Sequence, residues 1–405
     1  MTSRRSQRGI VAIIVVLALF SVTAIAGLAL ASSHFVSNKS RLQNVLDAAA
    51  LSSAKVLDQT GNVTTATSAA NATLAINAAA FPELAAGMGG VSVAVQFSNT
   101  LAPFTPGSTP GRYVRIRATN FTTDAGLLRV ASLPEVQLRA SAVAGPSPAI
   151  GTACNVAPML VCGNPTAGAV NYGYPPGSVQ VLKIGSGTNS PIGPGNFMLA
   201  RLGGSGGSVV RENLAGGYQN CATAGTTVET QTGNVVGPVA QGLNTRFGDY
   251  GAGLGIADYP PDVVTRQPTP ALTYTDDTNT IRQGSTVVTQ ASQINFNHAT
   301  YASQVAASNY NYSPAPGGSG AFARREFAVP IANCTGANNG NSTLPLLGFA
   351  CFFILQPVQQ SGQNSFVYGE ALQSCAAGGR PGPAPTAAPG PHIIQLYRDA
   401  GSPDS

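Results

Sequence analysis

The chain begins with its most hydrophobic stretch. Residues 9–31 form a run of 23 residues without a charged side chain, and Ile10–Phe20 is its most apolar part. As a helix rising about 1.5 Å per residue, this run spans about 33 Å, enough to cross a hydrocarbon core of roughly 30 Å. Because backbone polar groups inside a bilayer must pair within their own segment, we predict a transmembrane helix over 9–31.

The charges around this run predict its orientation. Arg4, Arg5 and Arg8 precede it, and no basic cluster follows closely. By the positive-inside rule, residues 1–8 are a cytoplasmic tip, and the bulk of the chain is periplasmic or extracellular. The alternative is a cleaved signal peptide, since Ala29-Leu30-Ala31 resembles a cleavage site. The run exceeds the roughly 7–15 apolar residues of a signal core, and a helical pattern follows it, which favours a retained inner-membrane anchor.

Helical periodicity continues through Ser32–Leu57, where the charged residues lie off an apolar stripe. A second, Ala-rich helix is predicted over Thr64–Ala80, ending before Pro82. The period then changes to two in three segments, which predicts strands. The stripe includes Leu42, Val45, Leu46 and Ala49, and the strands cover 91–97, 112–118 and 136–143. Residues 32–145 are therefore expected to form a long helix packed on a small sheet.

The remainder reads as a second, strand- and loop-rich unit over 150–377, after a linker at 145–148. Short strands are predicted at 179–184, 226–230, 326–331 and 350–355. Leu344–Val358 is apolar but interrupted by Pro345 and Gly348, so it predicts a buried strand rather than a second membrane span. Residues 378–405 are rich in Pro, Gly and Ala and predict a loose tail. The fold class is α+β.

Composition supports a location outside the cytoplasm. Only 9% of the 405 residues are charged, while Gly (47) and Pro (29) are abundant. Three of the five net positive charges belong to the N-terminal arginines. Without a basic surface interleaved with aromatic residues, nucleic-acid binding has no electrostatic basis.

All six cysteines follow the predicted membrane helix, and an even number in an oxidising compartment predicts disulfides. Six cysteines allow fifteen pairings, and spacing gives only a weak preference for a small loop between Cys154 and Cys162. Free thiols or a metal site are the alternatives, but no Cys-x-x-Cys occurs and His34, His298 and His392 are far apart in sequence. The cysteines are Cys154, Cys162, Cys221, Cys334, Cys351 and Cys375.

Candidate chemistry is weak elsewhere. Gly203–Gly207 fits the Gly-x-Ser-x-Gly pattern of a hydrolase, with Ser205 as nucleophile and His298 and Asp258 as nominal partners, but a Gly-rich loop matches this pattern by chance. The pairs Asp276-Asp277 and Asp258/Asp262 are calcium candidates, although acidic pairs in loops are usually only solvated. His34 reads as an interfacial residue. We therefore predict no catalytic residue, metal site or cofactor.

Two segments resemble a known family. The run QRGIVAIIVVLALF and the segment SRLQNVLDAAALSSAKVL (Ser40–Leu57) are similar to the N-terminal region of TadG- and TadE-like proteins of the tight-adherence (Flp, type IVb) pilus assembly system. Patches of the second unit, such as Gly233–Tyr250 and Arg325–Pro330, resemble TadG-related C-terminal regions. The resemblance implies a pilus-assembly role without enzymatic activity.

The sequence departs from this family at two points. No Asp-x-Ser-x-Ser motif of a von Willebrand A metal site is present. Pilin-like members carry Glu at the fifth position after the processing glycine, whereas Ile14 stands at that position after Gly9. Gly9 is therefore a candidate processing site that we expect to be used poorly.

We expect a structural function, as a minor pilin-like or assembly protein that acts by association with other pilus or pilus-assembly subunits and binds no small-molecule substrate. Small residues in the membrane, Gly27, Ala29 and Ala31, permit close helix packing. Leu42, Val45, Leu46 and Ala49 either continue that packing or are buried against the chain's own sheet. An envelope-anchored adhesin outside a pilus system is the main alternative, and an envelope hydrolase a distant one.

Overall fold

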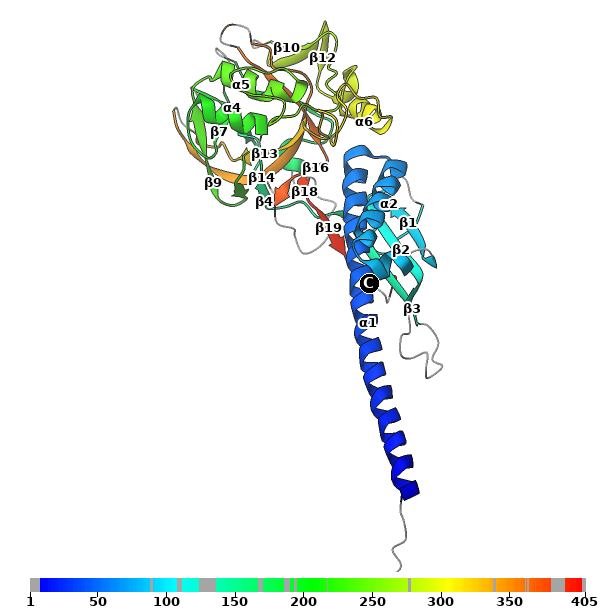
Figure 1. The fold of residues 1–405 in the computed structure, drawn as a ribbon. Coiled ribbons are helices and arrows are strands. Elements are labelled where there is room, and N and C mark those ends of the chain that lie inside the picture. Colours follow the sequence, from blue (N-terminus) through cyan, green and yellow to red (C-terminus); the bar gives the residue numbers. More distant parts are fainter. Residues whose placement is uncertain are drawn as a thin grey trace, which may run out of the picture. The chain divides into compact units, whose positions relative to one another are not determined.

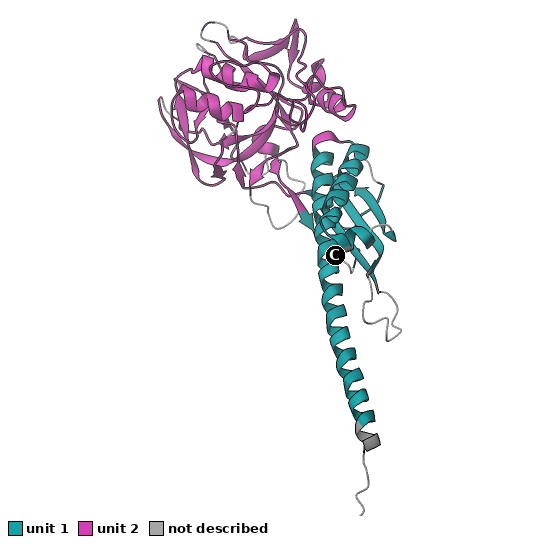
Figure 2. Cartoon of the chain, viewed as in Figure 1, with its two compact units in different colours: residues 1–58, 62–145, 396–405 teal, residues 59–61, 146–395 magenta. Residues whose placement is uncertain are grey.

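The structure is a computed structural model. Its described residues divide into two compact units, which Figure 2 colours teal and magenta. Unit 1 comprises residues 1–58, 62–145 and 396–405, and unit 2 comprises 59–61 and 146–395. The described residues are 8–87, 90–107, 111–123, 136–166, 170–185, 190–192, 195–216, 218–275, 278–337, 340–360, 362, 364–379 and 390–402.

Unit 1 is built around one continuous helix of 53 residues, α1, as the apolar run and the following stripe predict (Figure 1). Gly61, with a φ of +62°, ends the helix, and the side chain of Asn62 caps the next one by accepting from the backbone N–H groups of Thr64 and Thr65. The helices are α1 (Arg8–Thr60), α2 (Val63–Ala79) and the short, unpredicted α3 (Pro82–Gly87).

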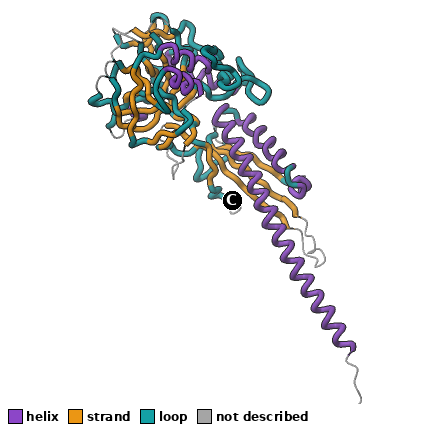
Figure 3. Tube along the Cα trace, turned by 60° about the vertical axis from the view of Figure 1, so that its left-hand side comes forward, coloured by secondary structure: helices purple, strands orange, loops and turns teal. Residues whose placement is uncertain are grey.

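A four-stranded sheet completes unit 1, in the order β1-β2-β3-β19. The pairs β1–β2 and β2–β3 are antiparallel, and Figure 3 shows the strands of this sheet beside the long helix. The Gln43 side chain joins α1 to β3 by a hydrogen bond to the Ser141 carbonyl. The strands are β1 (Ser92–Ser98), β2 (Tyr113–Thr123), β3 (Val136–Pro146) and β19 (Ile394–Tyr397).

The fourth strand differs from the predicted loose tail over 378–405. Residues 378–379, 390–392 and 394–397 lie in paired strands, and only 380–389 and 403–405 of this segment lie outside the described residues. Composition predicts chain stiffness poorly here, because β19 obtains its order from backbone pairing with β3, a partner about 250 residues away in sequence.

Unit 2 centres on a seven-stranded sheet in which five strands follow the order β5-β13-β14-β15-β6. The other two strands extend it from β14, since β9 pairs with β14 and β7 pairs with β9. The apolar segment 344–358 supplies β14, whose last seven residues are all buried, so the prediction of a buried strand is confirmed. The members are β5 (Val161–Cys162), β6 (Val179–Lys183), β7 (Asn196–Arg201), β9 (Thr227–Thr232), β13 (Glu326–Ala332), β14 (Thr343–Ile354) and β15 (Val367–Leu372).

Smaller sheets surround it, in the orders β10-β11-β12, β16-β18 and β17-β4-β8. Their strands are β4 (Thr152–Cys154), β8 (Cys221–Thr223), β10 (Leu272–Thr275), β11 (Thr280–Gln283), β12 (Thr286–Val288), β16 (Ser374–Ala376), β17 (Gly378–Gly379) and β18 (Gly390–His392).

Short helices in unit 2 were missed by the sequence prediction, since glycines and a proline dilute their apolar stripes. In α5, Val239 and Leu243 are fully buried. Gly237 and Pro238 precede them, and Gly242 lies between them. The helices are α4 (Gly207–Gly216), α5 (Val236–Asn244), α6 (His298–Ala306), η3 (Val170–Gly173), η4 (Thr245–Phe247) and η5 (Ala291–Gln293).

Three disulfides cross-link unit 2, and the prediction that the cysteines are oxidised is confirmed. The weak preference for a Cys154–Cys162 loop is wrong, because each of these residues has a more distant partner that the sheets bring opposite to it. Cys154 and Cys221 face each other across the β4–β8 pair. The bonds are Cys154–Cys221, Cys162–Cys334 and Cys351–Cys375.

Candidate functional site

The first part of α1 is an apolar rod. Its large apolar side chains between residues 13 and 30 are 55–69% exposed. The helix is long and apolar enough to cross a membrane by length and composition. Gly27 is itself buried within this otherwise exposed segment, and Ala31, at its end, is half-buried. A rod of this kind offers its surface to lipid or to other apolar helices.

The second part of α1 is packed inside unit 1. Leu42, Val45, Leu46 and Ala49 are at most 2% exposed. Of the two interpretations of this stripe, the structure places the side chains in the core of their own unit rather than on a surface that a second copy could reach. Association through these four residues is therefore not available in this state.

The polar residues of the same motif also serve unit 1. The Gln43 side chain donates to Asp47 Oδ1 at 2.8 Å and to the Ser141 carbonyl at 3.0 Å. Burial raises the pKa of Asp47, partly offset by that hydrogen bond. The guanidinium of Arg41 lies over the Phe81 ring at 5.2 Å, and Lys39 donates to the Arg139 carbonyl. The motif therefore fixes α1 to α3 and β3.

Unit 2 contains a buried charge network that the sequence analysis did not identify. The Arg325 side chain is fully buried and donates to the carbonyls of Val264, Arg266, Ile354 and Leu355 at 2.8–3.0 Å. Its guanidinium also lies 4.3 Å from the ring centre of Phe353 and 4.6 Å from that of Phe247. Burial lowers the pKa of Arg325 to about 10, with Asp262 opposing the shift.

Asp262 is the carboxylate of this network. It accepts hydrogen bonds from the backbone N–H groups of Val264 and Arg325 and from the Tyr301 hydroxyl, at 2.9–3.1 Å. Burial raises the pKa of Asp262 to about 6, against the lowering effect of the backbone hydrogen bonds and of the Arg325 charge. Fully buried Asp262 and exposed Asp258 do not form the calcium pair that their spacing allows.

Two carboxylates, those of Glu326 and Glu370, contact His298 at the start of α6. Its Nε2 lies 3.0 Å from Glu326 Oε1, and its backbone N–H donates to Glu370 Oε2 at 2.7 Å. Burial lowers the pKa of His298, but the hydrogen bond and charge of Glu326, with the charge of Glu370, outweigh burial and raise it above its ordinary value. His298 thus pairs with Glu326, not with the nominated Ser205.

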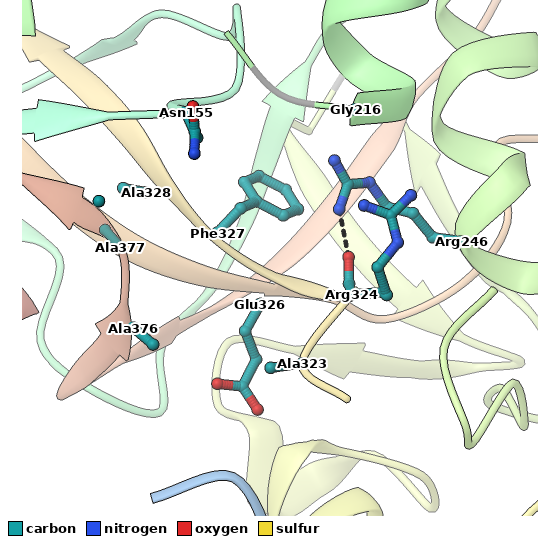
Figure 4. A pocket seen from close by; sticks show the side chains of 11 residues that line it. Asn155, Gly216, Arg246, Ala323, Arg324, Glu326, Phe327, Ala328, Ala376 and Ala377 are labelled. Carbon is teal, nitrogen blue, oxygen red and sulfur yellow. Dashed lines mark hydrogen bonds between the residues drawn. The ribbon is translucent and has the colours of Figure 1, made fainter. Parts of the chain in front are cut away.

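Beside this network lies a hollow of about 270 Å³, lined by Arg246, Arg324 and Glu326 together with smaller residues of β13, β16 and β17 (Figure 4). Arg246 is 4% exposed. Burial and the neighbouring Arg324 charge lower the pKa of Arg246, and burial lowers that of Arg324. With two arginines and one glutamate among its lining residues, the hollow has a net positive formal charge.

Another buried cation was also missed. Lys183 is fully buried and donates to the carbonyls of Ile184 and Ser365, to Ser365 Oγ and to Asn234 Oδ1. Burial lowers the pKa of Lys183 to about 8. All these partners are neutral, and a lone Lys in sequence carries no signal that would reveal such an environment.

The weaker sequence candidates do not assemble into a site. Ser205 lies in an exposed loop between β7 and α4, and His34 is exposed on α1 just after the apolar run. Asp276 and Asp277 lie outside the described residues. Within the part of the chain that the structure describes, no group of three or more His, Cys, Asp or Glu residues is placed to hold a metal ion.

The long apolar helix, which is the one candidate membrane span within the described residues, and the disulfide-linked second unit define the class of this protein. Residues 9–56 match the family described as putative Flp pilus-assembly TadE/G-like, which confirms the resemblance over α1. The N-terminal segment is thus that of an Flp pilus-associated protein. No curated protein and no solved structure matches this sequence.

Proposed function

We propose that the protein is a membrane-anchored structural component, minor pilin-like or an assembly protein, of a tight-adherence (Flp) pilus. It acts by protein–protein association and not as an enzyme. The observation that carries this proposal is the division of α1: the TadE/G-like segment places a 55–69% exposed apolar rod before a stripe that is buried in unit 1. An apolar rod of this length is stable in a bilayer, where the hydrophobic cost of exposure disappears.

In this proposal the apolar rod of unit 1 spans the inner membrane with residues 1–8 in the cytoplasm, and the remainder of unit 1 and all of unit 2 lie outside. Gly27 and Ala31 are the positions where a neighbouring helix approaches most closely. A reporter that is active only in the periplasm, fused after residue 57, is expected to be active. Activity of a cytoplasm-only reporter at the same position would reverse the orientation.

The N-terminus is expected to stay unprocessed at Gly9. Cleavage there would place a new amino group at Ile10, near the apolar Ile14 instead of the Glu of pilin-like family members, and an unpaired charge in hydrocarbon is costly. The mass of the intact membrane-extracted protein tests this. A mature N-terminus at Ile10 would indicate a filament subunit, and one at Ser32 a secreted protein.

Removal of the gene from a piliated host tests the pilus role itself. We expect few or no Flp pili by electron microscopy, with restoration by the full-length protein. A matched strain carries a variant in which Gly27 and Ala31 are changed to leucine, which keeps the apolar span but obstructs close helix packing, and should restore pili poorly. Normal piliation with lost surface attachment would instead favour the envelope-anchored adhesin.

A further inference from the structure

The hollow in unit 2 contains two guanidinium groups side by side. Figure 4 shows the Arg246 and Arg324 head groups together at one end, while the Glu326 carboxylate points away from them. Arg246 comes from the 3₁₀ turn η4, and Arg324 lies just before β13. Like charges this close repel each other, and such an arrangement favours occupation by an anion.

The surrounding residues do not supply that anion. In the described part of the chain, neither guanidinium has a carboxylate within ion-pair distance; the salt bridge nearest to this region joins His298 to Glu326. Asp262 is engaged by Val264, Arg325 and Tyr301. Glu326, the carboxylate in the lining of the hollow, is paired with His298, so neither Asp262 nor Glu326 forms an ion pair with Arg246 or Arg324.

The two arginines are held in position by backbone carbonyls. Arg246 donates to the carbonyls of Leu214 and Arg324, and Arg324 donates to those of Pro260 and Ala215 at 2.8 and 2.6 Å. These bonds orient the planar head groups but do not neutralise their charge. They use Nε and Nη2 of Arg324, so the donors on its Nη1 remain for a ligand.

Two tyrosines lie near the hollow. Gly216 lines the hollow, and an added Cβ at that position would lie 3.1 Å from the Tyr259 ring. Tyr250 donates its hydroxyl to the Tyr259 carbonyl at 2.9 Å, so a second aromatic ring lies nearby. Arginine and tyrosine are among the residues that most often carry the binding energy of protein interfaces.

We propose that this arginine pocket binds a carboxylate presented by a partner polypeptide, from an Asp or Glu side chain or a C-terminal residue, and so docks unit 2 on an acidic segment of another pilus-assembly subunit. The proposal rests on the proposed function for the identity of the partner. A carboxylate fits because two guanidinium groups lie together and Arg324 keeps the donors on its Nη1, and a hollow of about 270 Å³ admits a side chain but not a folded element.

The first test measures thermal unfolding of the intact, detergent-solubilised protein at constant ionic strength. N-acetylaspartate should raise the unfolding midpoint of unit 2 saturably, by roughly 2–6 °C, whereas neutral N-acetylasparagine should not. Arg324→Gln should abolish the response, and Arg282→Gln, the same charge change on β11, should keep it. An equal response in all variants, or a larger response to inorganic phosphate, would overturn the proposal.

A second variant guards against misfolding of Arg324→Gln. Ala377→Glu places a carboxylate on a residue that lines the hollow. This variant should have a higher unfolding midpoint than the natural protein and should no longer respond to N-acetylaspartate. An undiminished response in this variant would contradict binding in the hollow.

The second test identifies the partner in membranes of piliated cells. In Arg324→Lys, a carbodiimide should join the lysine Nζ to a nearby carboxylate as an amide, with the reagent leaving as a urea. Mass spectrometry should find an Asp, Glu or C-terminal carboxylate of another polypeptide at this lysine and not at position 282 of an Arg282→Lys control. Linkage only to Glu326, or no linkage, refutes the docking.

A genetic comparison separates this proposal from the proposed function. If removal of the gene abolishes pili but the Arg324→Gln variant restores full piliation, the pocket proposal is refuted and the proposed function remains.

Discussion

At the scale of single residues, charge burial distinguishes unit 2. Arg325 stabilises the crossing of several segments, because one guanidinium satisfies four carbonyls from the segments 264–266 and 354–355. Each buried carbonyl without a donor would cost about 1–3 kcal/mol. The side chain therefore acts as a polar centre around which apolar strands pack.

Substitution of this residue should be severe. Arg325→Met retains volume but leaves the four carbonyls unsatisfied and Asp262 without its nearest compensating charge. We expect the free energy of unfolding of unit 2 to fall by about 3–5 kcal/mol, measured by urea titration. Arg282→Met, which removes only a contact with the Ser285 carbonyl, is the control, and a similarly small effect at Arg325 would contradict this interpretation.

The His298–Glu326 pair predicts a pH dependence. Because the folded-state pKa of His298 is raised, its stabilising contribution is fully present below its ordinary pKa of about 6.5 and is lost as pH rises through the higher folded value. The folded state of unit 2 should thus lose stability, relative to His298→Gln, as pH rises from about 6.5 through the higher folded-state pKa of His298. Denaturant unfolding of both proteins across this range gives the difference directly.

Other groups that titrate should cancel in that difference. The raised pKa of Asp262, about 6, makes its own contribution decline as pH rises toward that value, and the lowered pKa of Lys183, about 8, makes its contribution decline as pH falls toward 8 from the ordinary value of 10.5. The His298→Gln variant keeps both Asp262 and Lys183. It also keeps the groups that face the imidazole, which are Glu326, Glu370, Arg325 and Tyr301. Parallel stability curves for the two proteins would assign the pH dependence to the groups that both proteins keep, and not to His298.

At the scale of elements, α1 has two environments along one continuous helix. Leu46 is fully buried in unit 1, whereas Leu17 is 61% exposed. Leu46→Ala should lower the free energy of unfolding of unit 1 by about 2–5 kcal/mol, since it removes transfer energy and leaves a cavity. Leu17→Ala is the matched control and should leave unit 1 unchanged, as hydrogen exchange of β2 and β3 can show. Equal effects would mean that the two segments are not distinct.

The family motif of α1 also has a structural meaning at this scale. Its Gln, Asp and apolar positions hold the helix against β3, so a resemblance that points to pilus assembly reflects packing within one polypeptide. Periodicity predicted the second part of this helix well, because one side of that part is buried in unit 1. It missed α4 and α5, whose glycines and short lengths carry little local signal.

At the scale of the whole molecule, the C-terminal residues belong to unit 1. Tyr397 meets Tyr113 edge to face with ring centres 5.8 Å apart. Buried Asp399 lies 3.7 Å from Arg115, and the Gly401 carbonyl accepts from Arg117. These contacts cover the side of β2 opposite to the one that carries Val114 and Ile116, because side chains alternate along a strand.

Truncation tests this closure. A protein ending at Gln395 loses half of β19 and leaves the buried Arg115 without Asp399, so hydrogen exchange in β2 and β3 should increase by at least roughly tenfold, while exchange in β13 and β14 should not change. A protein ending at Ser402 keeps these contacts and serves as the control. Unchanged protection of β2 in the shorter form would show that residues 396–402 do not stabilise the sheet.

The sequence by itself determined the features that arise from neighbouring residues. An uncharged run of 23 residues specifies a membrane-length helix, period-two segments specify strands such as β1 and β3, and an even set of cysteines indicates oxidation. The tertiary structure alone decided the disulfide partners, the return of β19 to unit 1 and the gathering of Arg246, Arg324 and Arg325. Each depends on contacts between residues tens to hundreds of positions apart, which burial and backbone pairing select and which no local pattern encodes.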